Sequence, residues 1–193
     1  MSDTPRSLLV RLAESPIESD WRRLVDLYQP FIDRWLCQAG ILEFDRSDLC
    51  QDVLTAVVKE LAGFRHSERV GAFRNWLRKV VVNRSRNYWR SKNRQENNNP
   101  VSSTLDELED PSSGLSGIWD REHDAYVTRK LLTLLEREFA PTTWTAFQRH
   151  VIDGNPAADV SRELGLSVNA VLIAKSRILR RLREEAVGLV DEL

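Results

Sequence analysis

The sequence predicts an all-α protein built from two small helical domains joined by an acidic flexible linker. Apolar residues recur at helical spacing along most of the chain, and period-two strands with hairpin turns are absent. A hydrophobic content of 41% and a charged content of 30% are typical of globular domains with real cores. Residues 95–124 carry eight acidic residues and one basic residue, a composition typical of a linker. We therefore expect domains at residues 1–94 and 125–193.

Four helices are expected in the first domain, because apolar side chains recur there at spacings of three and four. A loop bounded by two glycines separates the third helix from the fourth, and a proline inside the second helix is expected to bend it. The expected helices run from Pro5, from Asp20 to Gly40, from Ser47 or Asp48 to Ala62, and from Ala72 to about Lys92.

The fourth helix and the loop before it hold the strongest concentration of positive charge. Between Arg65 and Arg94 there are ten basic residues and one acidic residue, Glu68, although the whole chain has a net charge of −1. Aromatic residues lie in or beside this run, namely Phe64, Phe73, Trp76, Tyr88 and Trp89. Cationic side chains bind phosphates, and rings stack on bases that have left the duplex. The pattern predicts a site for opened or single-stranded nucleic acid.

Four more helices are expected in the second domain. Proline, glycine and capping residues separate them. They run from Ala125 to Phe139, from Thr142 to Asp153, from Asn155 to Leu164, and from Ser167 to about Glu185.

Residues 156–183 match the requirements of a helix-turn-helix. Ser161 is small where the two helices would meet, Gly165 tolerates the positive φ of the turn, and Ser167 can cap the second helix. Apolar residues suited to the shared core are Val160, Leu164, Leu166 and Val171. The second helix is strongly basic, which favours DNA binding, and the alternative is a helical hairpin with a solvated basic face.

Two motifs of the first domain are similar to those of a known family. The first consists of Asp45, Asp48, Leu49, Gln51, Asp52, Val53 and Val57. The second consists of Phe64, Phe73, Arg74, Trp76, Leu77 and Asn83, followed by Arg84, Arg86, Tyr88, Trp89 and Arg90. With the terminal helix-turn-helix, they resemble bacterial RNA polymerase sigma factors of the sigma-70 family, extracytoplasmic-function (ECF) type, between about residues 20 and 185.

This resemblance implies a sigma factor that binds core RNA polymerase and directs promoter-specific transcription initiation. Residues 1–94 correspond to region 2, a helical bundle that binds polymerase and recognises and melts the −10 element. Residues 125–193 correspond to region 4, whose helix-turn-helix reads the −35 element. The acidic segment 95–124 corresponds to the linker between them.

In the family, the loop before the basic helix and the helix itself capture a flipped base of the −10 element. The implied DNA contacts are Phe64, Arg65, His66, Arg74, Asn75, Arg78, Lys79, Asn83, Arg84, Arg86, Asn87, Trp89 and Arg90. Asparagine and arginine can bond base edges, whereas Lys79, Arg84, Arg86 and Arg90 are favoured for phosphates. Core packing is the alternative for the rings, and for Trp89 stacking on a base and packing remain equally open.

The third helix carries the polymerase contacts that the resemblance implies, against the clamp helices of the largest subunit. They are Asp48, Leu49, Gln51, Asp52 and Val53. A second reason for Asp48 is that acidic residues stabilise a helix N-terminus through its dipole.

The last helix carries the implied −35 contacts. They are Ser167, Asn169, Leu172, Ile173, Lys175, Ser176, Arg177, Arg180 and Arg181. Many relatives have Arg-Ser after the position of Val171, but this chain has Leu172 and Ile173. Apolar groups read only thymine methyls and shape, so the −35 sequence cannot be transferred from the family. Arg177 is the favoured base contact, and the remaining basic residues are favoured for phosphates.

The implied partners are promoter DNA and core RNA polymerase, which region 2 contacts at the clamp helices and region 4 at the flap region. Many relatives also bind an anti-sigma factor. We expect a cytoplasmic protein without a membrane span that is a monomer when free. Cys37 and Cys50 are widely spaced, and no Cys/His cluster or catalytic triad pattern is present. We therefore expect no metal, no cofactor and no catalysis.

Two other functions compete with this interpretation. A dimeric helix-turn-helix regulator that acts without polymerase would explain the second domain but leave the basic run unused. A recombinase or nuclease would need a nucleophile or a metal-binding carboxylate cluster beside the basic helix, for which only Asp45, Asp48 and Asp52 are near. Their spacing on a helix without a histidine favours docking over metal binding.

Overall fold

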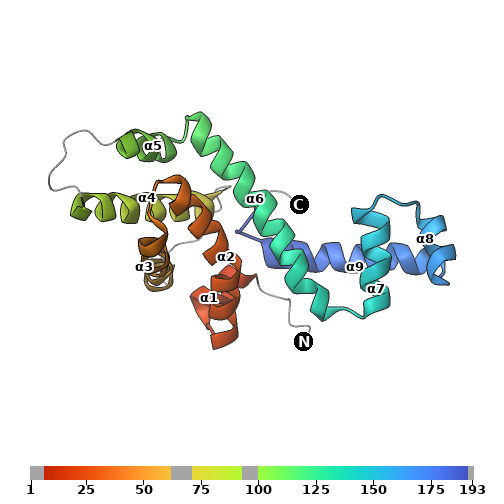
Figure 1. Cartoon of the computed structure of the whole chain (residues 1–193). Coiled ribbons are helices and arrows are strands. Elements are labelled where there is room, and N and C mark those ends of the chain that lie inside the picture. Colours follow the sequence, from red (N-terminus) through yellow and green to blue (C-terminus); the bar gives the residue numbers. More distant parts are fainter. Residues whose placement is uncertain (1–6, 62–70, 93–99, 191–193) are drawn as a thin grey trace. The chain divides into compact units, whose positions relative to one another are not determined.

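The computed structural model describes residues 7–61, 71–92 and 100–190, and helices dominate all three ranges (Figure 1). The prediction of an all-α fold is confirmed. The helices are α1 (Leu8–Glu14), α2 (Glu18–Gln38), α3 (Glu43–Leu61), α4 (Ala72–Lys92), α5 (Pro100–Glu109), α6 (Gly114–Leu135), α7 (Pro141–Phe147), α8 (Ala157–Leu164) and α9 (Val168–Ala186). A short 3-10 turn, η1 (Glu136–Glu138), follows α6, and a π-helical turn, η2 (Gln148–Ile152), follows α7.

The chain divides into two compact units, and each is described by itself. The first unit contains Ser7–Val127 together with the segment that starts at Val187, and the second contains Thr128–Ala186. The boundary lies within α6, close to the predicted start of the second domain at residue 125. None of the described helices combines the length and apolarity that a membrane crossing requires.

The core of the first unit is formed by the apolar faces of its helices. Ser7 caps α1, since its Oγ accepts a hydrogen bond from the amide of Val10, and Gly40 follows α2 with a φ of 72°. Helices α2, α3 and α4 pack on one another and bury side chains at spacings of three and four. The buried side chains include Leu24, Phe31, Trp35, Val53, Val57, Phe73, Leu77 and Val81.

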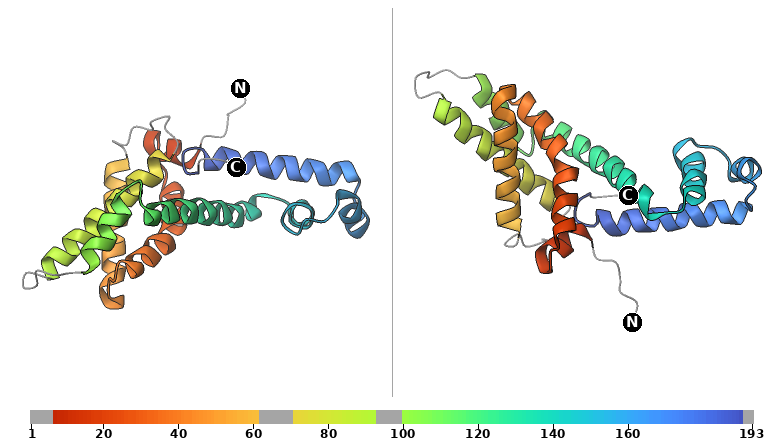
Figure 2. Two further views of the ribbon diagram at one scale, coloured as in Figure 1. Left: turned by 90° about the horizontal axis from the view of Figure 1, so that it is seen from above. Right: turned by 60° about the horizontal axis from the view of Figure 1, so that its bottom comes forward.

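The acidic segment 95–124 is helical in its described part, so the prediction of a flexible linker there is wrong. Leu105 and Leu108 of α5 are each 2% exposed, and α5 packs along α4 (Figure 1 and Figure 2). In α6, Trp119 and Val127 are completely buried. The acidic composition hid two short apolar stripes, at spacings of three and four, that give each helix a core-facing side.

Helix boundaries in the second unit differ slightly from those predicted. The helix expected from Ala125 is the C-terminal part of α6, and the next helix begins at Pro141 after Ala140 rather than after Thr142. Pro141 occupies the first helical position, where a missing N–H costs nothing. The expected end near Asp153 and Gly154 is confirmed, because η2 stops at Ile152 and Gly154 has a φ of 76°.

Candidate nucleic-acid interface

Helix α4 presents two chemically different sides. Phe73, Leu77, Val81 and Ser85 follow one another at intervals of four and are buried in the core. On the side away from the core, Lys79, Asn83, Asn87 and Arg90 are exposed. We call these four residues the exposed face of α4.

A surface groove of about 390 Å³ lies along this exposed face. Three arginines and two asparagines contribute to its walls, namely Arg84, Arg86, Arg90, Asn83 and Asn87. Asparagine can both donate to and accept from a base edge, and guanidinium groups donate to phosphates. The groove therefore offers the two kinds of group that a single nucleic-acid strand requires.

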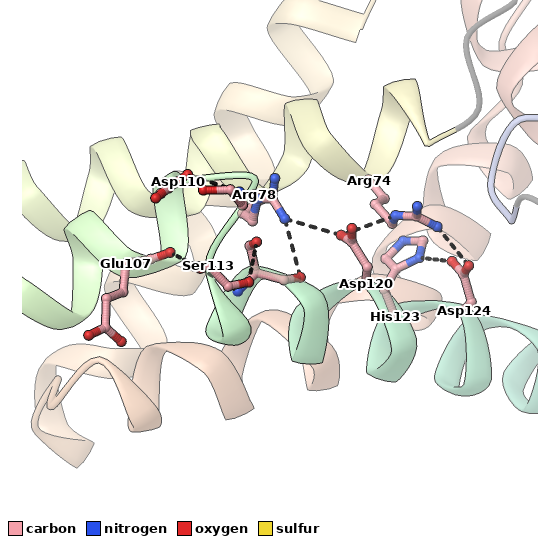
Figure 3. A network of polar contacts seen from close by, with 10 residues as sticks. Arg74, Arg78, Glu107, Asp110, Ser113, Asp120, His123 and Asp124 are labelled. Atoms are coloured by element: carbon pink, nitrogen blue, oxygen red, sulfur yellow. Dashed lines mark hydrogen bonds and ion pairs between the residues drawn. The ribbon is translucent and has the colours of Figure 1, made fainter.

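Two predicted DNA contacts, Arg74 and Arg78, lie on another side of α4 and are engaged by α6 (Figure 3). Arg74 contacts Asp120 at 3.1 Å through Nε and Asp124 at 2.7 Å through Nη1. Arg78 donates from Nη1 to the carbonyl of Ser116 at 3.3 Å and to Asp120 at 3.2 Å.

Burial decides the role of Arg78. Its side chain is only 3% exposed, and that of Arg74 is 12% exposed. Burial lowers the pKa of Arg78, and the carboxylate of Asp120 opposes that shift. The guanidinium of Arg78 joins α4 to α6 inside the first unit and is not exposed to a strand in this structure, so its contact with DNA stays a prediction. Arg74 makes the same kind of connection.

A buried polar group lies next to these arginines. His123 is fully buried and contacts Asp124 through Nδ1 at 2.9 Å and the hydroxyl of Tyr28 through Nε2 at 3.2 Å. Burial lowers the pKa of His123, although the hydrogen bond to Asp124 opposes this. Burial works to raise the pKa of Asp124, but the hydrogen bond with His123 and the charge of Arg74 outweigh it, so that pKa is lowered.

Arg86 lies at the edge of the groove and is held by α5. Its Nη1 lies 2.5 Å from Glu109 and its Nη2 lies 2.6 Å from Asp106. Burial alone would lower the pKa of Arg86, but its hydrogen bonds and charge interactions with these two carboxylates raise it. These two acids were not predicted as partners of Arg86, because their segment has the composition of a linker. Their spacing of three, on the same helix as Leu105 and Leu108, was the available signal.

The remaining predicted −10 residues have different surroundings. Trp89 is half-buried and donates from Nε1 to the carbonyl of Ala39 at 3.3 Å, so its ring faces the turn after α2. Asn75 and Trp76 are half-buried near the start of α4, and Trp76 packs on Phe73 with ring centroids 5.5 Å apart. The predicted contacts Phe64, Arg65 and His66 lie outside the described residues.

The predicted polymerase contacts on α3 divide into two groups. Asp48, Gln51 and Asp52 are exposed and form a polar strip. Leu49 and Val53 are 7% and 0% exposed and belong to the core. These two apolar residues lie on the side of α3 that packs on the other helices, and their contact with polymerase stays a prediction.

The predicted helix-turn-helix is confirmed in the second unit. Gly165 has a φ of 67°, Ser161 donates its hydroxyl to the carbonyl of Leu166 at 2.5 Å, and Ser167 Oγ accepts from the amide of Ala170 at 3.1 Å. Helices α7, α8 and α9 share a small core. Its members are Ala146, Val160, Val171 and Ala174, with Ala157, Leu164 and Leu166 packed against them.

Most predicted −35 residues are exposed on the turn or on α9. They are Ser167, Asn169, Leu172, Ile173, Lys175, Ser176, Arg177 and Arg180. Arg181 is different, because its Nε contacts Glu138 at 2.9 Å and its Nη2 contacts the buried Glu185 at 2.5 Å. Arg181 therefore ties α9 to η1 through side-chain ion pairs, and its contact with DNA stays a prediction.

A second groove, of about 300 Å³, lies beside α9. Ile173 and Arg177 line it together with Thr142 and Thr143 from the start of α7. The two threonines were not predicted to lie at this surface. The sequence indicated only a helix cap at Thr142, which gave no reason to place either residue beside the last helix. Within the described ranges, no group of three or more His, Cys, Asp or Glu side chains is placed to hold a metal ion.

Comparison with protein families identifies part of the first unit. Residues 24–95 match the family model for Sigma-70 region 2. The match includes α3 and α4 and leaves out the second unit, so it covers less than half of the chain. No curated protein matches the chain. A Sigma-70 region 2 domain implies a role in RNA polymerase binding and promoter recognition.

Proposed function

We propose that this chain is a sigma factor of the ECF type, which binds core RNA polymerase and directs promoter-specific transcription initiation. The match of residues 24–95 to Sigma-70 region 2 is the observation that carries the proposal. In this proposal the first unit holds the −10 element and the second reads the −35 element. The protein acts in the cytoplasm and is a monomer when free.

The exposed face of α4 supports a role in capturing the −10 strand. Asn83 and Asn87 offer amides to the edges of unpaired bases, while Lys79, Arg84 and Arg90 offer charge to phosphates. Arg74 and Arg78 hold α4 in place inside the unit through their contacts with α6. The proposed set of −10 contacts therefore contains fewer residues than the family resemblance alone implies.

The polar strip on α3 supports polymerase binding. Asp48, Gln51 and Asp52 are exposed on one helix, and carboxylates on a rigid helix suit a basic partner surface. We assign this strip to the clamp helices of the largest polymerase subunit and the second unit to the flap region. Leu49 and Val53 act indirectly, because they anchor α3 in the core.

Helix α9 supports contacts in the major groove of the −35 element. Arg177 is exposed and lies beside a groove, where it can reach a base edge, and Lys175 and Arg180 are exposed and suited to phosphates. Leu172 and Ile173 are 45% and 47% exposed, and apolar side chains at this position can contact thymine methyls.

In vitro transcription with purified core polymerase tests the proposal. A promoter library is transcribed by core enzyme with and without the protein, and by variants on each surface. We expect transcripts from a defined promoter class only when the protein is present, with weaker initiation for Asn83→Ala. Equal transcription by core enzyme with and without the protein would refute the proposed function.

A further inference from the structure

The acidic helix α5 covers one of the groove's arginines. Asp106 and Glu109 hold the two terminal nitrogens of Arg86 at 2.6 and 2.5 Å, and Arg86 also lines the groove along the exposed face of α4. A phosphate that approached Arg86 would meet two carboxylates that already take one N–H donor from each terminal nitrogen. Both carboxylates are partly exposed, 63% for Asp106 and 40% for Glu109, so they also repel a strand that lies in the groove.

The acids of α5 are more exposed than those of α6, which also places acids against arginines of α4. Asp106 and Glu109 are 63% and 40% exposed, whereas Asp120 and Asp124 are 31% and 30% exposed. The start of α6 is built into the core, because Trp119 packs on Phe31 and Trp35 with ring centroids 4.9 and 4.8 Å apart. The extensive packing of α5 is with α4, through the two buried leucines Leu105 and Leu108 and the ion pairs of Arg86. Arg74 and Arg78 are only 12% and 3% exposed, so their pairs are closed to a strand, whereas Arg86 is 25% exposed and its pairs are open to exchange.

We propose that α5 is an acidic cover that competes with the DNA strand for Arg86. In the free protein, Asp106 and Glu109 neutralise Arg86, and strand capture requires the guanidinium to exchange these carboxylates for a phosphate. The inference rests on the proposed function, since it assumes that a single strand occupies the groove on α4. Asp106 and Glu109 thereby regulate strand binding through their contacts with Arg86.

The test measures binding of a short fluorescein-labelled single DNA strand to the full chain by anisotropy at low salt. Asp106→Asn/Glu109→Gln removes the two acids that hold Arg86. The matched control, Glu18→Gln/Glu107→Gln, removes the same charge from two exposed sites. Glu18 contacts the exposed Arg22 at the start of α2. A third variant adds Arg86→Gln to the first pair of changes.

We expect Asp106→Asn/Glu109→Gln to bind the strand about tenfold more tightly than the matched control, equivalent to ~1.4 kcal/mol. Adding Arg86→Gln should abolish this gain, because the freed guanidinium is its source. A gain that persists without Arg86 would overturn the cover, since it would come from general charge alone.

A further variant, Arg90→Gln, separates this inference from the proposed function. If Arg90→Gln weakens binding while Asp106→Asn/Glu109→Gln equals its control, the cover is refuted and strand binding by α4 stands. If no variant binds the single strand, the strand-capture role of α4 is refuted, and the cover with it.

Discussion

Replacing Arg78 by methionine should destabilise the first unit rather than weaken DNA binding. The substitution keeps most of the aliphatic stem but removes a guanidinium that is 3% exposed and that donates to the carbonyl of Ser116 and to Asp120. Hydrogen bonds to charged groups contribute about 1.5–3 kcal/mol. Breaking a fully buried ion pair costs about 3–5 kcal/mol, but Asp120 is 31% exposed and keeps its contact with Arg74. We therefore expect a loss of about 2–3 kcal/mol in the free energy of unfolding.

Urea denaturation followed by tryptophan fluorescence measures this loss. With an m-value of about 2 kcal/mol/M, the midpoint of the first unit should fall by about 1–1.5 M. Arg90→Met is the matched control, since it makes the same change on the exposed face of the same helix. Surface substitutions usually stay within about 0.5 kcal/mol, so its midpoint should hardly move.

Binding of a single DNA strand should rank the two variants in the opposite order from their stability. At temperatures and urea concentrations where both are folded, Arg90→Met should weaken strand binding, whereas Arg78→Met should bind like the unmodified chain. If Arg78→Met left the unfolding midpoint unchanged and weakened strand binding more than Arg90→Met, our assignment of Arg78 to the interior would be refuted.

Three further predictions concern other parts of the chain. Burial lowers the pKa of His123, so the unfolded chain binds its proton more readily, and stability should decline as the pH falls below about 6.5; denaturation at a series of pH values should show a smaller decline in His123→Asn. Gly165→Ala should lower the free energy of unfolding of the second unit by about 1–2 kcal/mol, since φ is 67°. Gly114→Ala, at a site of the first unit with open space and no positive φ, should leave the free energy of unfolding of that unit unchanged, and calorimetry compares the two variants. Arg177→Glu should reduce transcription from −35-dependent promoters, whereas Arg181→Gln should mainly lower the thermal midpoint; a larger transcriptional effect of Arg181→Gln would contradict the roles given to the two arginines.

Local patterns account for the features that were predicted correctly. The bounds of α4 follow from Gly71 and from its apolar periodicity, and the turn between α8 and α9 follows from Gly165 and Ser167. Each of these signals lies within a few residues of the feature that it predicts. The resemblance of the two motifs in residues 45–90 to the sigma-70 family was likewise readable without coordinates. The Sigma-70 region 2 match supports this part of it, and the ECF type stays a prediction.

The contacts that were not predicted join residues that are distant from one another along the chain. Arg78 and Asp120 are 42 positions apart, and Arg86 lies 20 positions from Asp106. A basic run and an acidic segment were therefore interpreted as separate features, although each neutralises part of the other. Mean composition concealed Leu105, Leu108 and Trp119, whose burial packs the acidic segment against the other helices of the first unit.

The linear order of residues was sufficient for the helical class, the turn chemistry and the presence of one strongly basic helix. Those properties depend on backbone propensity and side-chain periodicity over one or two helical turns. Which of the arginines face solvent and which are tied to carboxylates depended on how α5 and α6 pack on α4. Burial and ion pairing between distant segments arise only when the chain folds, because a charge acquires its partner from the three-dimensional neighbourhood and not from its neighbours in sequence.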